Sequence, residues 1–132
     1  MDRMIDAVIN GEKRPLNYSM EVMFNMAEKY GSISKALDII NEGGRKGFET
    51  VRWFAVQMAN DAELCRRDMG YDPKPMLTEN SISLRMRPID YELLTAAVVD
   101  AISTGYKREI ATDEEIDLGL AELNAKKTQA GA

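Results

Sequence analysis

The feature that most constrains the fold is an apolar seam whose members step by 3, 4, 3, 4, 3 and 4 residues. Side chains at this spacing lie on one face of an α-helix. We therefore predict that residues 46–69 form the longest helix of the chain. This helix is either the central core helix of a small bundle or, in part, a surface that binds another protein or a second copy of this chain. The sequence therefore leaves open whether the protein forms a homo-oligomer. In the second case Met58 and Met69 are candidate partner-binding residues. The seam consists of Phe48, Val51, Ala55, Met58, Ala62, Cys65 and Met69.

A β-hairpin is predicted at residues 4–18, before the seam. Ile5, Ala7 and Ile9 occupy alternate positions, as in a half-buried strand. The dipeptide Asn10-Gly11 follows, and it tolerates the two positive φ angles of a type I′ turn. Pro15 cannot donate to a strand ladder, so the return strand must be short or lie at an edge.

Two short helices are predicted between the hairpin and the seam. Ser19 is a candidate N-cap for the first, which ends at Gly31. Ser32 or Ser34 caps the second, which ends at Gly43-Gly44. The apolar face of the first helix comprises Met20, Met23, Phe24, Ala27 and Tyr30, and that of the second comprises Ile33, Ala36, Leu37 and Ile40.

The region after the seam begins with a proline-rich loop at residues 70–75. A short helix is predicted to start at residues 78–80, although the next apolar residues alternate as they do in a strand. A clearer helix follows Pro88 and stops at Gly105. Its wide apolar face comprises Ile89, Leu93, Leu94, Ala97, Val98, Ala101 and Ile102.

The last segment, residues 109–132, is predicted to form an acidic helix with a frayed end. Thr112 and Glu115 have the spacing of a capping box. Between Glu109 and Glu122 the chain has six acidic residues and no basic one. The apolar residues of this helix are candidates for binding a partner: Ile116, Leu120 and Leu123 on one stripe, with Leu118 beside it.

These patterns predict a mainly α fold, a small helical bundle with a short N-terminal β-hairpin. Residues 1–108 form the helical domain, with the hairpin at 4–18. Residues 109–132 form the acidic C-terminal helix and tail. A chain of 132 residues is long enough for one core and too short for two comfortable domains.

Composition excludes several kinds of chemistry. The chain has no histidine and a single cysteine, which removes the usual general base, Ser-His and Cys-His pairs, disulfides and most zinc sites. A net charge of -5 argues against nucleic-acid binding. No apolar run is long enough to cross a membrane, and the acidic N-terminus is unlike a signal peptide. We expect a cytoplasmic protein that is not an enzyme, with no catalytic residues, no metal and no cofactor.

The run from Ile9 to Ile40 resembles the opening of tail assembly chaperones from long-tailed (siphovirus-type) bacteriophages and prophages. These begin with a short hairpin around an Asn-Gly turn and continue with a helix that ends in Glu-Lys-Tyr-Gly-Ser. Two later segments, Pro88–Ile102 and Glu115–Leu123, fit the same layout. The matching positions in the first run are Asn10, Gly11, Pro15, Leu16, Glu28, Lys29, Tyr30, Gly31 and Ser32.

The resemblance implies an assembly factor that works in the host cytoplasm and is not retained in the mature virion. Such proteins bind the tape measure protein, keep it soluble and help recruit tail tube subunits. Nine methionines are in keeping with an adaptable binding surface, although core filling is the commoner explanation. The alternative is a small phage-encoded regulator or adaptor that contacts DNA or a structural tail component.

A longer product is a further implication of the resemblance. The family commonly makes it by programmed frameshifting near the end of the short frame, and the extension recruits the tail tube protein. Ala125-Lys126-Lys127 can be encoded by a slippery heptamer. A plain helix end with two lysines is the other explanation, and the coding DNA decides between them.

Overall fold

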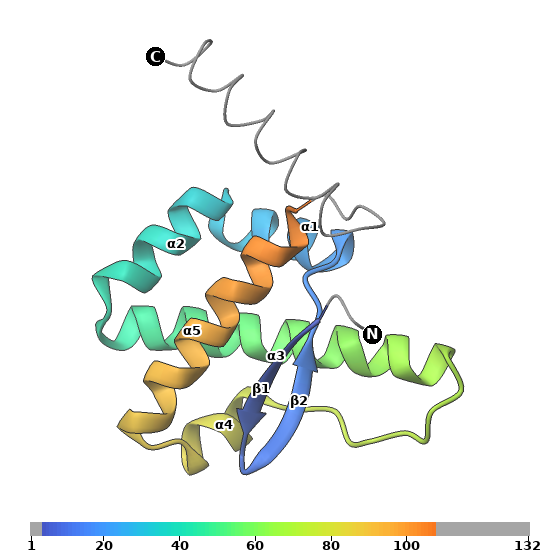
Figure 1. Cartoon of the computed structure of the whole chain (residues 1–132). Helices are drawn as coiled ribbons and strands as arrows, with labels where there is room; N and C mark the ends of the chain where they lie inside the picture. The colour runs from blue at the N-terminus through green and yellow to red at the C-terminus, as the bar shows by residue number, and fades with distance from the viewer. Residues whose placement is uncertain (1–3, 108–132) are drawn as a thin grey trace, which may run out of the picture.

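The computed structural model describes residues 4–107 and has the predicted class, mainly α with an N-terminal hairpin (Figure 1). The long helix α3 runs through the middle of the molecule, and the hairpin, α2, α4 and α5 all contact it. The elements are β1 (Ile5–Ile9), β2 (Glu12–Leu16), α1 (Met20–Tyr30), α2 (Ile33–Glu42), α3 (Gly44–Asp68), α4 (Glu79–Arg85) and α5 (Pro88–Gly105).

The hairpin forms as predicted. Asn10 and Gly11 have φ angles of 54° and 79°, as a type I′ turn requires, and Ile9 pairs with Glu12 across it. Ala7 and Ile9 are buried. Val8 points to the other side of the two-stranded sheet and is exposed.

The predicted seam is buried from Val51 to Ala62, which confirms this part of it. Other faces of α3 are buried as well. Phe54 and Ala59 also lie in the core, because several elements surround the middle of α3. Met58 is fully buried, so its prediction as a partner-binding surface residue is wrong. Met69 follows the end of α3 and is exposed.

Three of the five described helices begin with side-chain caps. Ser19 is the predicted cap, Ser32 is one of the two predicted candidates, and Thr78 is the first of the residues predicted to start the short helix. The hydroxyls of Ser19, Ser32 and Thr78 accept hydrogen bonds from backbone N–H groups three residues later, at 3.3, 3.2 and 3.2 Å respectively. These caps start α1, α2 and α4 where the sequence places them.

Only part of the apolar face predicted for α1 packs against the core. The fully buried residues of α1 are Val22 and Met26, which lie outside the predicted face. Met23 and Tyr30 pack partly against the core. The remaining predicted members point away from it and are exposed: Met20, Phe24 and Ala27.

The predicted face of α5 is also wider than the part that the core uses. Leu94, Val98 and Ile102 are buried. Ile89 and Leu93 are exposed, because they lie on a different face of α5 from Tyr91 and Leu94, which pack into the core. The helix ends at Gly105, as predicted.

The loop at residues 69–78, which we call the pinned loop, is attached to α3 by a buried carboxylate. Glu63 accepts hydrogen bonds from the Arg66 and Arg67 side chains at 2.6 and 3.0 Å and from the Lys74 backbone N–H at 2.8 Å. Burial by itself raises the pKa of Glu63, but these donors outweigh it and lower the pKa from 4.5 to about 2. Asn60 adds two bonds to the Leu77 backbone.

The second predicted unit, residues 109–132, lies outside the described residues. None of the helices described within residues 4–107 is long and apolar enough to cross a membrane.

Candidate functional site

A hollow of about 650 Å³ lies between β1 and the first half of α5, and we call it the apolar groove. One wall is the strand and the hairpin turn. The other wall is the α4–α5 junction and the exposed side of α5. The lining residues are Asp6, Ala7, Val8, Asn10, Gly11, Arg85, Met86, Arg87, Asp90, Leu93, Leu94 and Ala97.

Local sequence rules place both walls. The strand period of two turns Val8 away from the core while Ala7 faces it. On the other wall, Pro88 disfavours a helical conformation for the residue before it, so Arg87 is extended. The Asp90 carboxylate accepts a hydrogen bond from the Arg87 backbone N–H at 3.2 Å, and α5 therefore begins at a fixed point beside the groove.

Large apolar side chains are exposed in the groove and next to it. Val8 is 67% exposed and Leu93 is 70% exposed, although both line a hollow. Ile89 and Leu84 continue the apolar surface outside the lining, at 68% and 84%. Isolated exposed apolar residues are ordinary, but a cluster around a hollow is typical of a binding site.

The charges at the rim of the groove are mixed. Arg85 and Arg87 bring positive charge from the α4–α5 junction. Asp6 and Asp90 bring negative charge, and Asp6 is also 3.6 Å from the Lys13 ammonium. A polyanion such as DNA needs clustered positive charge, so this rim suits an apolar ligand with charged flanks better than a nucleic acid.

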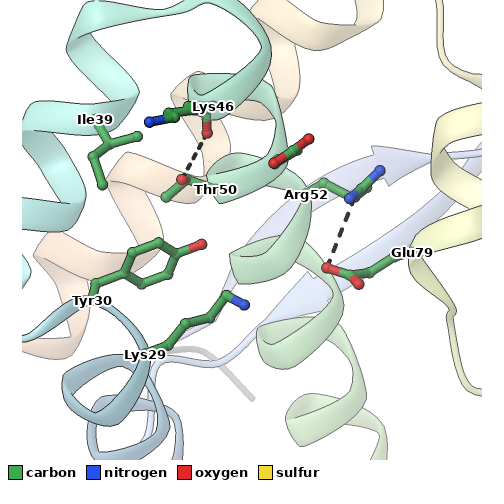
Figure 2. A pocket seen from close by; sticks show the side chains of 8 residues that line it. Lys29, Tyr30, Ile39, Lys46, Thr50, Arg52 and Glu79 are labelled. Carbon is green, nitrogen blue, oxygen red and sulfur yellow. Dashed lines mark hydrogen bonds and ion pairs between the residues drawn. The ribbon is translucent and has the colours of Figure 1, made fainter.

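A second, polar hollow of about 400 Å³ lies where the end of α1 meets α2 and α3 (Figure 2). Tyr30 and Lys29 lie on one side of it, and Thr50 and Arg52 of α3 lie on the other. Arg52 is 3.8 Å from Glu79, and the Thr50 hydroxyl donates to the Lys46 backbone carbonyl at 2.8 Å. Much of the polar lining is therefore already engaged within the protein.

The titratable groups of the described chain do not suggest a nucleophile. Burial raises the pKa of Tyr30, which keeps its phenol protonated at neutral pH. Burial, with Asp61 and Asp68 nearby, also raises the pKa of the Cys65 thiol, so it is less reactive than a free cysteine. Within residues 4–107, no cluster of three or more potential metal ligands of the His, Cys, Asp and Glu types is present.

The predicted partner-binding residues have three different outcomes. Met58 is in the core, and Met69 is exposed at the pinned loop and does not line the apolar groove. The other four lie outside the described residues: Ile116, Leu118, Leu120 and Leu123.

Sequence reasoning did not identify the apolar groove. Leu93 belongs to the apolar face predicted for the helix after Pro88, and a pattern of hydrophobic residues does not show which of them the rest of the chain covers. The available signal was Val8, an apolar residue at a strand position whose neighbours Ala7 and Ile9 face inwards.

Comparison with known proteins identifies no protein similar to this chain. The chain matches no family model, no curated protein and no solved structure.

Proposed function

We propose that this protein is a tail assembly chaperone of a long-tailed phage, which binds the tape measure protein and keeps it soluble. The observation that supports the proposal is the apolar groove, with Val8 and Leu93 exposed on its two walls. A tape measure protein is mostly long helix with an apolar stripe, and before assembly that stripe promotes aggregation.

The shape of the groove suits a helical client. Its two walls are a strand and a helix, with Leu94 and Ala97 towards the base. An amphipathic helix inserts its apolar face into such a groove through side chains spaced three and four residues apart. Met86 also lines the groove, and a flexible thioether side chain adapts to successive segments of a long client.

A chaperone also has to release its client. The groove is open and only two large apolar side chains on its lining are strongly exposed, which favours contacts that the tail tube can displace. A longer, frameshifted form recruits the tail tube protein in this proposal. The chaperone acts in the host cytoplasm and is absent from the mature virion.

The test is co-expression with the tape measure protein encoded by the same genome. Val8→Ser combined with Leu93→Ser removes the exposed apolar groups from both walls. We expect the soluble yield of the tape measure protein and its co-purification to fall sharply, since a few central apolar residues carry most of the affinity of an interface.

The matched control is Leu64→Ser, which changes a 55% exposed leucine on α3 that does not line the groove. It should leave co-purification unchanged. Equal recovery with the groove variant and the control would reject the groove as the client site.

The alternative, a regulator that contacts DNA, has a separate test. Retention of the protein on duplex DNA that weakens steeply as salt increases would support it. The acidic net charge predicts no such retention.

A further inference from the structure

The outer edge of β1, the edge that faces away from β2, carries backbone groups that no other backbone group in residues 4–107 pairs. Beside a two-residue turn the closing residues, Ile9 and Glu12, exchange both hydrogen bonds, and bonded and non-bonded pairs then alternate along an antiparallel hairpin. Asp6 and Val8 therefore belong to non-bonded pairs, and their N–H and C=O groups point away from β2. Within residues 4–107 neither residue has a backbone partner on this side.

This outer edge forms part of the wall of the apolar groove. Asp6 and Val8 both line that hollow. Helix α5, which supplies the opposite wall, contacts β1 and lies on the side of it that faces away from β2 (Figure 1). The groove therefore opens along the edge to which a further strand would be added.

The opposite edge of the hairpin, on β2, is protected against strand addition. Pro15 has no N–H to offer, and the Arg14 side chain donates to the Pro75 carbonyl of the pinned loop at 2.9 Å. Just after β2, the Asn17 backbone N–H donates to the Met58 carbonyl of α3 at 3.1 Å. Strand β1 has no proline, and no segment within the described residues is hydrogen-bonded to its outer edge. The unprotected edge is thus a particular feature of the groove side.

We propose that the apolar groove binds an extended segment of a partner protein, which adds to β1 as a third strand. Asp6 and Val8 each supply an N–H donor and a C=O acceptor to it, and main-chain hydrogen bonds of this kind give much of the affinity when a peptide extends a sheet. A helix cannot use these groups, because its own backbone is bonded internally. The inference goes beyond the proposed function, and an extended segment and a helix would compete for the groove.

The walls of the groove determine the side-chain pattern of the extended segment. Residues that are opposite each other on adjacent strands project to the same face of a sheet. The ligand residue between those that pair with Asp6 and Val8 therefore projects to the same face as Ala7, which is buried towards α5. There it meets Leu93 and Ala97, which line the groove. The segment needs apolar residues at alternate positions.

The charges near the hairpin turn favour an acidic residue at one end of the segment. Arg85 and Arg87 line the groove together with the turn residues Asn10 and Gly11, and the α4–α5 junction lies near the turn (Figure 1). Both arginines are exposed, and neither forms an ion pair with another residue of the range 4–107. A carboxylate on the ligand would complement them.

Amide hydrogen exchange in the full-length protein, followed by NMR residue by residue, tests whether the edge is available. The Ala7 N–H is bonded to Arg14 and should exchange slowly, whereas the Asp6 and Val8 N–H groups should exchange many-fold faster. Equally slow exchange at all three residues, at every protein concentration, would show that the edge is already covered and would overturn the proposal. Slow exchange that is lost on dilution would assign the edge to a second copy and overturn it as well.

The probe for binding is a short peptide of alternating valine and threonine with a glutamate at each end. Its addition should slow exchange at Asp6 and Val8 and give nuclear Overhauser contacts between the peptide backbone and β1. The control peptide has the same composition with its valines grouped together, so it lacks the alternation. Equal binding of the two peptides, or binding of neither, would overturn the proposal.

Val8→Pro removes one donor from the outer edge. The Val8 N–H points away from β2, so the hairpin keeps its ladder, and the affinity for the alternating peptide should fall at least about tenfold. Lys13→Pro is the matched control, since Lys13 is paired with Val8 but directs its N–H to the other edge. Equal affinities of the two variants would contradict the proposal. Urea denaturation checks that both fold, and the wild-type measurements decide if Val8→Pro does not.

The wild-type protein separates this proposal from the proposed function. Binding of the alternating peptide by a protein that does not co-purify with the tape measure protein would support the strand site and reject the chaperone function. Co-purification by a protein that does not bind the peptide would overturn the strand site and leave the chaperone function standing.

Discussion

Two regions of the molecule, the pinned loop and the apolar groove, treat buried and exposed side chains in opposite ways. At the pinned loop, a charged side chain, Glu63, is placed inside and fully satisfied by donors. At the apolar groove, the large apolar side chains of Val8 and Leu93 are left outside. The comparison indicates that the first region exists for the stability of the fold and that the second is available for a partner.

The physical costs of the two regions differ as well. A buried carboxylate is tolerated only when hydrogen bonds replace its hydration, so each donor to Glu63 is needed. An exposed valine or leucine costs the folded chain little, because it is equally exposed when the chain unfolds. Substitutions at the pinned loop should therefore change stability, and those at the groove should change binding.

The largest expected effect is that of Glu63→Gln. The amide accepts fewer and weaker hydrogen bonds, and it leaves Arg66 and Arg67 without their counter-charge. We expect a loss of about 3 kcal/mol in the free energy of unfolding, measured by urea denaturation at pH 7. A change close to zero would mean that the pinned loop is not a stabilising region.

The effect of Glu63→Gln should depend on pH. The pKa of Glu63 is about 2 in the folded protein, below its ordinary value of 4.5, so its stabilisation is complete above about pH 5. As the pH falls from 5 towards 2, protonation removes that stabilisation. The difference between wild type and variant should shrink over this range, and a constant difference would contradict the ionised role of Glu63.

A smaller loss is expected for Asn60→Ala. The Asn60 amide binds both the N–H and the carbonyl of Leu77, at 2.8 and 3.0 Å. Its removal leaves two backbone groups without partners and should cost about 1–3 kcal/mol by the same denaturation measurement. Asn80→Ala, on an exposed turn of α4, is the control and should cost much less.

At the hairpin turn of the groove, Gly11→Ala should have a modest effect on stability. An added Cβ at Gly11 meets no atom within 4 Å, so the cost is only that of a φ angle of 79°. We expect about 1 kcal/mol by thermal or urea unfolding. A much larger loss would show that the groove wall contributes more to the fold than the comparison allows.

The smallest change in stability is expected for Leu93→Ser. A side chain that is 70% exposed should alter the free energy of unfolding by no more than about 0.5 kcal/mol. The affinity for the client should nevertheless fall, by roughly tenfold for each 1.4 kcal/mol lost at the interface. Calorimetric titration with a tape measure fragment measures this, and Leu64→Ser is again the control.

Much of the fold could be predicted from local signals in the sequence. Asn10-Gly11 specifies the turn, and serine and threonine caps at residues 19, 32 and 78 specify where three helices begin. Each of these signals acts over a few residues, so no tertiary information is needed. The long helix α3 could be predicted because its apolar residues keep helical spacing over several turns.

The remainder depends on contacts between distant parts of the chain. Val22 and Met26 were missed as the core face of α1, because Met20 and Phe24 offer an equally apolar face and only packing selects between them. Glu63 looks like a surface residue in sequence, and its burial depends on a backbone N–H eleven residues later. The groove depends on which face of α5 the rest of the chain leaves uncovered.

Hydrogen exchange of the full-length protein, with and without a soluble tape measure fragment, tests the central claim most directly. The account predicts that the fragment slows exchange of backbone amides in β1, in the hairpin turn and in the first half of α5, while the pinned loop is unchanged. Protection that appears at the pinned loop and leaves β1 and α5 unaffected, or no protection at all, would contradict it.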